Sequence, residues 1–206
     1  MSDFFAIHVD NPQSRLLRQA VTVIESGGLI IYPTDSGYAL GCALGNHKAL
    51  ERIRILRQLD KQHHLTLICY DLSQLGTYAK ISKSLYRLLK AFTPGCYTFI
   101  LNATSEVPKK MLHPKRKTLG LRIPKHQITL ALLECLNAPL MSTTLILPGA
   151  SAPLSQPEAI RDLLGSQIDL IIDGGVCAYE PTTVIDLTGD YPRLLREGSG
   201  DPAPFC

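Results

Sequence analysis

The 206-residue sequence lacks the motifs that mark the commonest nucleotide and metal sites. It contains no GxxxxGK(S/T) loop, and no GxGxxG follows a predicted strand, which excludes a P-loop and a dinucleotide-binding fingerprint. The histidines show neither HExxH nor HxH spacing, and the six cysteines lie far apart without a CxxC pair. We therefore expect buried free thiols, and no structural metal, disulfide or tightly bound cofactor.

The sequence also lacks segments for export or for crossing a membrane. Its longest uncharged run, residues 135–157, contains four prolines, which a lipid-embedded backbone accommodates poorly. The first residues, MSDFFAIHVDNPQ, have no basic start, apolar stretch or small-residue cleavage site. These absences predict a cytoplasmic protein with no membrane partner.

The composition is typical of a folded globular protein. Hydrophobic residues make up 45% and charged residues 19%, which excludes a disordered chain, a collagen and a coiled coil. The length suits one domain with its own core, and no internal repeat or low-complexity linker divides the chain. We therefore expect a single domain over residues 1–206.

The net charge of +3 is unevenly distributed. Residues 1–157 carry 18 basic and 9 acidic side chains, whereas residues 158–206 carry 3 basic and 9 acidic ones. One basic cluster contains no acidic residue and consists of Lys109, Lys110, Lys115, Arg116, Lys117, Arg122 and Lys125. Such a run is typical of a solvated surface loop, and it is also typical of a surface that binds polyphosphate or an RNA backbone. Because no aromatic residue interrupts it, phosphate contact is the better functional interpretation.

Helical and strand patterns alternate along the chain. We expect helices over about 12–26, 46–59, 83–92 and 125–137, with one more after Ser155. The expected strands cover 29–32, 65–69, 97–101, 118–123, 140–147, 168–172, 182–187 and 193–197. Asn11 and Asn46 are expected N-caps, and Ser155 with Glu158 makes a capping box. Strands outnumber helices too far for a parallel βαβ repeat, so we expect an α/β fold with a twisted, open, mixed sheet and packed helices.

Several short patterns have both a structural and a functional interpretation. Arg54 and Arg57 share one face of a predicted helix. They are either solvated surface side chains or a pair that binds phosphate or carboxylate. PTDSGY and MSTT place hydroxyl side chains at strand ends, where open α/β sheets bind ligands. Turns also favour hydroxyl residues, so turn chemistry alone explains them equally well. Tyr86 and Lys90 match a short-chain dehydrogenase pair by spacing, but without a glycine fingerprint they indicate one helix face.

These pieces follow the order of one known family. The segment YPTDSGYALG (32–41) resembles the YPTxxxYxLG signature of the YrdC family, the threonylcarbamoyl-adenylate synthases. Matching segments follow in order: TPGCYTF (93–99), GLRIP (120–124), STT with LPG (142–149), TTVID (182–186) and REG (196–198). The resemblance runs from about residue 12 to about residue 200 and is greatest to the YciO branch.

The resemblance implies a fold and a reaction. The fold is a twisted open sheet around a large basic cavity. The reaction joins bicarbonate and L-threonine, and the resulting carboxylate attacks ATP, with Mg²⁺, to give threonylcarbamoyl-AMP and pyrophosphate. Other proteins then transfer the threonylcarbamoyl group to tRNA. The cation clusters of this chain make tRNA or double-stranded RNA a further expected partner.

The resemblance also implies site residues. Thr34 and Arg122 would hold threonine, and Thr183 would close the same pocket. The remaining roles that it implies are catalytic for Arg57 and nucleotide-binding for Ser142, Thr144 and Arg196, and Arg54 is a further catalytic candidate. The basic cluster, rather than the resemblance, makes Lys109, Lys110, Lys115, Arg116 and Lys117 the expected RNA-binding residues.

Two departures fall on the catalytic tetrad of the synthases. Where they carry KxR, this chain has Ile55 before Arg57, and where they carry SxN it has Thr144 and Ile146. Arg54 is the candidate substitute for the missing lysine, although guanidinium and ammonium are not equivalent in a point contact with phosphate. We therefore expect a synthase-like enzyme with weak or altered activity. The alternatives are an RNA-binding protein without synthase activity and an enzyme that transfers carbamoyl from carbamoyl phosphate.

Overall fold

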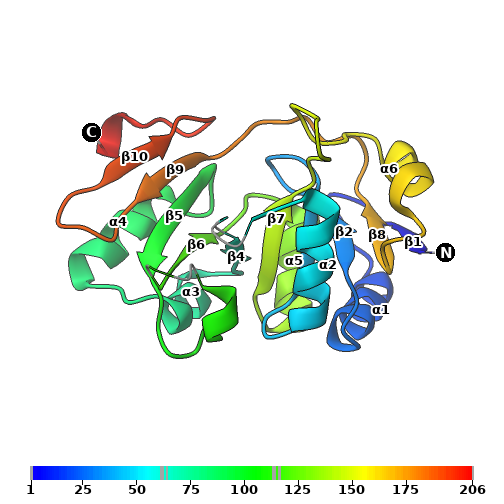
Figure 1. The fold of residues 1–206 in the computed structure, drawn as a ribbon, viewed down its shortest axis with the longest axis horizontal. Coiled ribbons are helices and arrows are strands. Elements are labelled where there is room, and N and C mark those ends of the chain that lie inside the picture. Colours follow the sequence, from blue (N-terminus) through cyan, green and yellow to red (C-terminus); the bar gives the residue numbers. More distant parts are fainter. Residues whose placement is uncertain (1, 61–62, 64, 113–114, 116, 206) are drawn as a thin grey trace.

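The computed structural model describes residues 2–60, 63, 65–112, 115 and 117–205. Within these residues, ten strands form one sheet in the order β1–β8–β2–β3–β7–β4–β6–β5–β9–β10 (Figure 1). Four neighbouring pairs are parallel and five are antiparallel, which confirms the expected mixed sheet. The strands are β1 (Asp3–Ala6), β2 (Ile30–Tyr32), β3 (Ala39–Ala43), β4 (Thr66–Ile68), β5 (Tyr97–Asn102), β6 (Thr118–Arg122), β7 (Leu140–Thr144), β8 (Leu170–Asp173), β9 (Thr183–Asp186) and β10 (Arg193–Arg196).

The helices cover the two sheet faces unequally. In the described residues they are α1 (Ser14–Glu25), α2 (His47–Arg57), α3 (Leu72–Tyr78), α4 (Lys83–Phe92), α5 (Gln127–Leu136) and α6 (Pro157–Leu164), with 3-10 turns η1 (Lys109–Met111) and η2 (Ala203–Phe205). One core contains side chains of α2, α3, α4 and α6, and a second core contains those of α1 and α5. The second core extends as far as Leu140 of β7 and Ile68 of β4, so the same face of the sheet has no helix over β6, β5 and β9.

Two predicted helix starts differ from the structure. The first helix begins at Ser14 rather than after Asn11, because the His8 Nδ1 atom accepts hydrogen bonds from the backbone N–H groups of Asp10 and Asn11. These bonds hold the preceding residues in a turn. The capping box of Ser155 does not form either, because the helix begins at the proline after Gln156, and Gln156 is the N-cap. A residue before proline adopts extended backbone, which sets this boundary.

Three short elements were not among the predicted ones. They are β1, β3 and α3, and none has more than seven residues. Strand β3 (ALGCA) is buried except at its last residue, which is half-buried, and it has no polar alternation, and α3 contains Gly76 in its interior. Strand pairing and packing against other elements therefore determine where these three elements form, because the local sequence pattern does not indicate them.

Two other expectations concern thiols and membranes. Cys42, Cys69, Cys96, Cys135 and Cys177 are free, and among them Cys42, Cys69 and Cys177 are buried. In the described part of the chain, no helix combines the length and apolar character that crossing a membrane requires.

Asn46 is an N-cap, as predicted, and its side-chain Oδ1 accepts a hydrogen bond of 3.1 Å from the Ala49 backbone N–H. Replacing Asn46 with Ala should lower the free energy of unfolding by about 1 kcal/mol, because this N–H loses its partner. Urea denaturation followed by circular dichroism measures the change. Asn46→Ser, which keeps a capping oxygen, should cost less, and equal losses in both variants would contradict the capping role.

Candidate functional site

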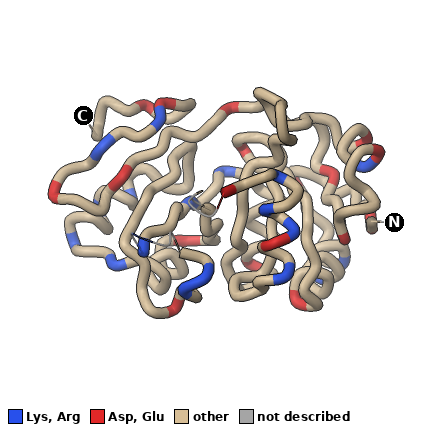
Figure 2. The backbone as a smooth tube through the Cα atoms, in the orientation of Figure 1, with Lys and Arg blue, Asp and Glu red and all other residues tan. Residues whose placement is uncertain are grey.

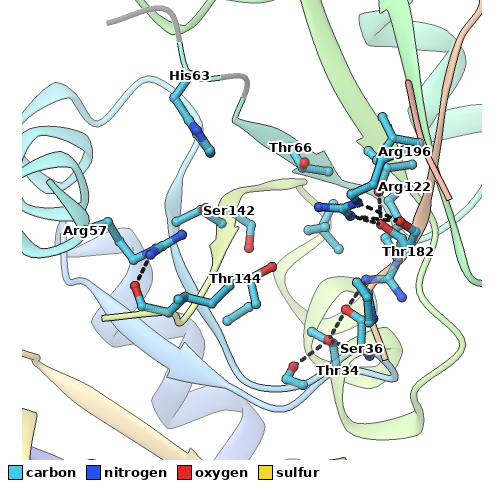
Figure 3. A pocket seen from close by; sticks show the side chains of 18 of the residues that line it. Thr34, Ser36, Arg57, His63, Thr66, Arg122, Ser142, Thr144, Thr182 and Arg196 are labelled. Carbon is cyan, nitrogen blue, oxygen red and sulfur yellow. Dashed lines mark hydrogen bonds between the residues drawn. The ribbon is translucent and has the colours of Figure 1, made fainter. Parts of the chain in front are cut away.

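Polar side chains line a cavity of about 470 Å³ beside the uncovered part of the sheet, a size typical of small-molecule sites (Figure 3). Its walls come from the loop after β2, the end of α2, strands β4 to β7, β9 and β10, and the connection between β8 and β9. The lining residues are Thr34, Ser36, Gly37, Ala39, Arg57, Asp60, His63, Thr66, Ile68, Thr98, Ile100, Arg122, Ser142, Thr143, Thr144, Ile146, Tyr179, Pro181, Thr182, Val184, Leu195 and Arg196.

Successive side chains of a strand face opposite sides of the sheet, and this alternation determines which of them form the cavity floor. In β4, Thr66 and Ile68 face the cavity, whereas Leu67 between them belongs to the core. The neighbouring β6 places Gly120 opposite Thr66. A Cβ on Gly120 would lie 3.0 Å from Thr66 Oγ1 and 3.4 Å from a side-chain carbon of Thr98. The glycine therefore keeps the floor open between two hydroxyl residues.

A buried ion pair lies at one end of the cavity. Arg122, the last residue of β6, is 4% exposed and donates hydrogen bonds of 2.6 Å to Asp35 Oδ1 and Ser36 Oγ. Thr34 Oγ1 donates to the Gly37 carbonyl at 2.6 Å and accepts from the Ser36 backbone N–H at 3.1 Å, which fixes this turn. Two atoms of the pair, Arg122 Nε and Asp35 Oδ2, are buried without a hydrogen-bond partner among the described residues.

Arg57 approaches the cavity from the opposite side to Arg122 (Figure 3). It is the last residue of α2, and its guanidinium donates to the backbone carbonyl of Ile146. Its Nε is buried without a partner, and it forms no ion pair with a carboxylate of the described residues. Burial lowers the pKa of Arg57, but an arginine remains charged at neutral pH. Arg57 therefore brings uncompensated positive charge.

Arg196 supplies a third cation. A register shift between Leu194 and Arg196 places both Leu195 and Arg196 on the cavity. The guanidinium donates to the Thr182 carbonyl at 2.8 and 3.1 Å and to Thr182 Oγ1 at 3.2 Å. Thr182 Oγ1 in turn lies 2.9 Å from Thr98 Oγ1. These bonds hold Arg196 against β9.

Ser142 and Thr144 lie between the arginines, and both are on the cavity face of β7 (Figure 3). Ser142 is 2% exposed, donates to the Leu40 carbonyl at 2.9 Å and lies 2.6 Å from the Tyr32 hydroxyl. Burial raises the pKa of Tyr32 well above its ordinary range, so this hydroxyl stays protonated and donates to Ser142. Ser142 is thus oriented before any ligand binds.

Thr183 was expected to close the pocket, but the structure places it elsewhere. It is fully buried, donates to the Gly200 carbonyl and accepts a 3.0 Å bond from the Gly198 N–H. A Cβ on Gly198 would lie 2.2 Å from a backbone oxygen, so only glycine allows this approach. Neighbouring residues of a strand face opposite sides, which is why Thr182 lines the cavity and Thr183 does not.

Arg54 also lies off the cavity. Its Nη1 donates to Glu51 Oε1 at 2.6 Å, one helical turn earlier on α2, which holds the side chain along the helix. Ile55, at the position where the synthases carry lysine, is 75% exposed and does not line the cavity. Only Arg57 of this helix end reaches the cavity.

Most of the predicted basic cluster lies outside the cavity as well. Lys109, Lys110, Lys115 and Lys117 are exposed, and Arg116 lies outside the described residues. Within this run, the cavity lining contains Arg122 alone of the residues that the structure describes. Contact of these lysines with RNA stays a prediction.

Several lining residues were not predicted from the sequence. They are Asp60, His63, Thr66, Thr98, Thr182 and Tyr179, whereas Ser36 belongs to the PTDSGY segment that was expected to offer hydroxyl groups. The alternation of strands 65–69 and 97–101 would have selected Thr66 and Thr98, because apolar neighbours flank both. Tyr179 lies between β8 and β9 in a segment without a periodic pattern, so no local signal marks it.

The arginines dominate the charge of the cavity. Burial lowers the pKa of His63, the charge of Arg57 lowers it further, and Asp60 opposes the shift, so His63 is neutral at neutral pH. Within the described ranges, no group of three His, Cys, Asp or Glu side chains is arranged to hold a metal ion. The arrangement suits an anion with several charges, surrounded by hydroxyl groups.

The chain is similar in sequence to known proteins. A family model for Sua5, YciO and YrdC, described as "Telomere recombination", matches residues 22–198. YciO of Escherichia coli K12 is 55% identical over 205 residues and all of both chains. A threonylcarbamoyl-AMP synthase of Vibrio vulnificus is 31% identical over 186 residues, 88% of this chain and 98% of that protein.

Solved structures agree on the fold. The crystal structure of E. coli YciO matches with a TM-score of 0.96 and 54% identity over all of both chains. P. abyssi Sua5, in complex with L-threonine, matches with a TM-score of 0.87 and 28% identity, covering 96% of this chain and 58% of that one. The sequence motifs, the fold and these relatives show that the chain belongs to the Sua5/YciO/YrdC family.

Proposed function

We propose that this chain forms a carbamoyl-adenylate from ATP, L-threonine and bicarbonate, in the manner of a threonylcarbamoyl-AMP synthase. The observation that carries the proposal is the charge arrangement of the cavity. The neutralised pair of Arg122 and Asp35 lies at one end, and Arg57 and Arg196, which form no ion pair with a described carboxylate, lie at other points. A zwitterion and a polyanion are the ligands that complement these two environments.

The ion pair supports an amino-acid subsite. Arg122 Nε is an unused donor and Asp35 Oδ2 is an unused acceptor, both buried. Arg122 lines the cavity, so the carboxylate of an α-amino acid can accept from its Nε, whereas Asp35 does not line the cavity and balances the charge of Arg122. Thr34 and Ser36 add hydroxyls for the substrate hydroxyl. The family relative from P. abyssi was solved with L-threonine, which supports threonine as this substrate.

The rest of the cavity supports a nucleotide subsite. Arg57 and Arg196 bring positive charge to the phosphates, and Ser142 and Thr144 offer hydroxyl groups between them. Mg²⁺ that arrives with ATP supplies further charge neutralisation when bound. The lining residues themselves contribute position and electrostatic stabilisation.

The proposed reaction needs positive charge near the phosphates more than it needs a dedicated acid or base. The threonine amine and bicarbonate condense to an N-carboxylated amino acid with loss of water, and an oxygen of this carboxylate attacks the α-phosphorus of ATP. The bond between the α-phosphorus and the bridging oxygen breaks, and pyrophosphate leaves. Negative charge grows on the phosphate oxygens during this step, so fixed guanidinium groups lower the barrier more than a general base would.

The two departures from the tetrad lie in different environments. Ile146 lines the cavity, whereas Ile55 is on the exposed side of α2. An isoleucine side chain cannot replace an amide that donates and accepts hydrogen bonds. The cavity therefore lacks one polar contact beside Arg57, which supports a slow or altered synthase.

Arg57→Ala should lower pyrophosphate release by about 100-fold or more, since one charge-stabilising donor typically supplies that factor. The assay contains ATP, Mg²⁺, bicarbonate and threonine, and it is repeated without threonine. Arg54→Ala is the matched control on the same helix and should stay within about twofold, because Arg54 lies off the cavity. Wild-type release no greater than that of Arg57→Ala would overturn the proposal.

Ile146→Asn should raise threonine-dependent turnover about tenfold, because the new amide faces the nucleotide end of the cavity. The backbone carbonyl that holds Arg57 is unaffected. Ile55→Lys alone should change turnover less, since position 55 is exposed. Unchanged rates in the double variant would indicate that the cavity takes a different substrate.

Thr183→Val should raise the KM for ATP about tenfold and leave kcat within about twofold. The variant keeps the side-chain shape but leaves the Gly198 N–H and the Gly200 carbonyl buried without partners, which loosens the segment that follows Arg196. Thr183→Ser should restore the wild-type KM. If Thr183→Val instead lowered kcat and left KM unchanged, Thr183 would act on the reaction rather than on the position of Arg196.

A further inference from the structure

A second hollow, of about 630 Å³, lies between α3 and α4 and shares no lining residue with the cavity. Its floor is apolar, with Leu72 and Ile81 half-buried, and its rim is basic. We call it the α3–α4 groove, and it is lined by Leu72, Ser73, Gly76, Ile81, Ser82, Lys83, Tyr86, Arg87 and Lys90. None of the chemistry described above uses it.

Three cations of the groove have no internal role. Lys83, Arg87 and Lys90 form no hydrogen bond or ion pair with any residue that the structure describes. The lining residues include no carboxylate, and α4 itself contains no acidic residue, as the blue segments along it show (Figure 2). Spacings of four and three residues place the cations on one side of α4, along about 10 Å of helix. A row of unpaired cations attracts an extended anion.

Tyr86 lies among these cations and is 44% exposed. It follows Lys83 by three residues and precedes Lys90 by four, so it shares their side of the helix. An exposed aromatic ring beside a row of cations is the arrangement on which unpaired bases stack. The predicted lysine cluster at 109–117 has no such ring.

Gly76 gives an independent reason to expect an external ligand. It lies inside α3, where glycine is less stable than alanine, and a Cβ at this position would meet nothing within 4 Å. No internal contact therefore requires glycine here. A bare backbone on the groove wall allows a ligand to approach more closely than any side chain would.

We propose that the α3–α4 groove binds a single-stranded segment of nucleic acid. Lys83, Arg87 and Lys90 contact successive phosphates, a base stacks on Tyr86, and the strand passes close to Gly76. A duplex keeps its bases stacked on one another and offers only its backbone, so it cannot use the aromatic ring. An acidic protein segment supplies negative charge but no base to stack on Tyr86, so it would use only part of the groove.

The inference goes beyond the proposed reaction and does not depend on it. Its test uses fluorescence anisotropy of the full chain with a labelled oligouridine of about 10 nucleotides, a length within the usual site sizes. Arg87→Ala with Lys90→Ala should weaken binding about tenfold and reduce the slope of log affinity against log salt by about 1.4, since each phosphate contact contributes about 0.7. Arg15→Ala with Arg18→Ala removes the same charge from exposed positions of α1, which does not line the groove, and should change the affinity less than about twofold.

Three single variants separate the effects of base stacking and of close approach from the effect of charge. Tyr86→Ala should weaken binding about tenfold, whereas Tyr86→Phe should bind like the wild type because the ring remains. Gly76→Ala should raise the melting temperature and still weaken binding, a combination that general damage to the fold cannot produce.

Three results would overturn the proposal. The first is the absence of oligouridine binding at low salt. The second is equal loss in the two double variants, or equal affinity for the same strand within a duplex, either of which would show binding by charge alone. The third is complete displacement of the strand by poly-glutamate with Tyr86→Ala unaffected, which would make an acidic protein segment the occupant.

Discussion

The uneven helical cover of the sheet is the constraint on which the site depends. Four helices cover one face over its length, but α1 and α5 cover only part of the other. Strands without a helix over one face leave room there for a cavity, and alternation places Thr66, Thr98, Ser142 and Thr182 on it together with apolar residues such as Ile68. The site is therefore a consequence of how the helices are distributed over the mixed sheet.

The three arginines around that face are held in two different ways. Arg122 is buried and nearly neutralised by Asp35 at 2.6 Å, because an isolated buried charge would be costly. Arg57 and Arg196 are held instead by backbone carbonyls, which orient a guanidinium without cancelling its charge. This difference divides one cavity into a region suited to a zwitterion and a region suited to phosphates.

Some residues outside the cavity lining also determine where the lining side chains lie. The buried Thr183 hydroxyl joins two glycines of the C-terminal segment, and this contact fixes the chain that follows Arg196. Figure 1 shows the connection from β8 to β9 passing from one half of the sheet to the other, and it brings Tyr179 and Thr182 to the cavity. Contacts distant in sequence thus place the functional side chains, while the surface of α4 remains free for a separate ligand.

The sequence by itself determined the α/β class, the mixed sheet, most of the element positions and the family, because periodicity and motif order are local properties. It also selected six cavity residues: Thr34, Arg57, Arg122, Ser142, Thr144 and Arg196. Only the tertiary structure decided that Thr182 rather than Thr183 faces the cavity, and that Arg54 is paired with Glu51. Those choices depend on strand register and on partners from other elements, and a one-residue change of register reverses the face of every side chain.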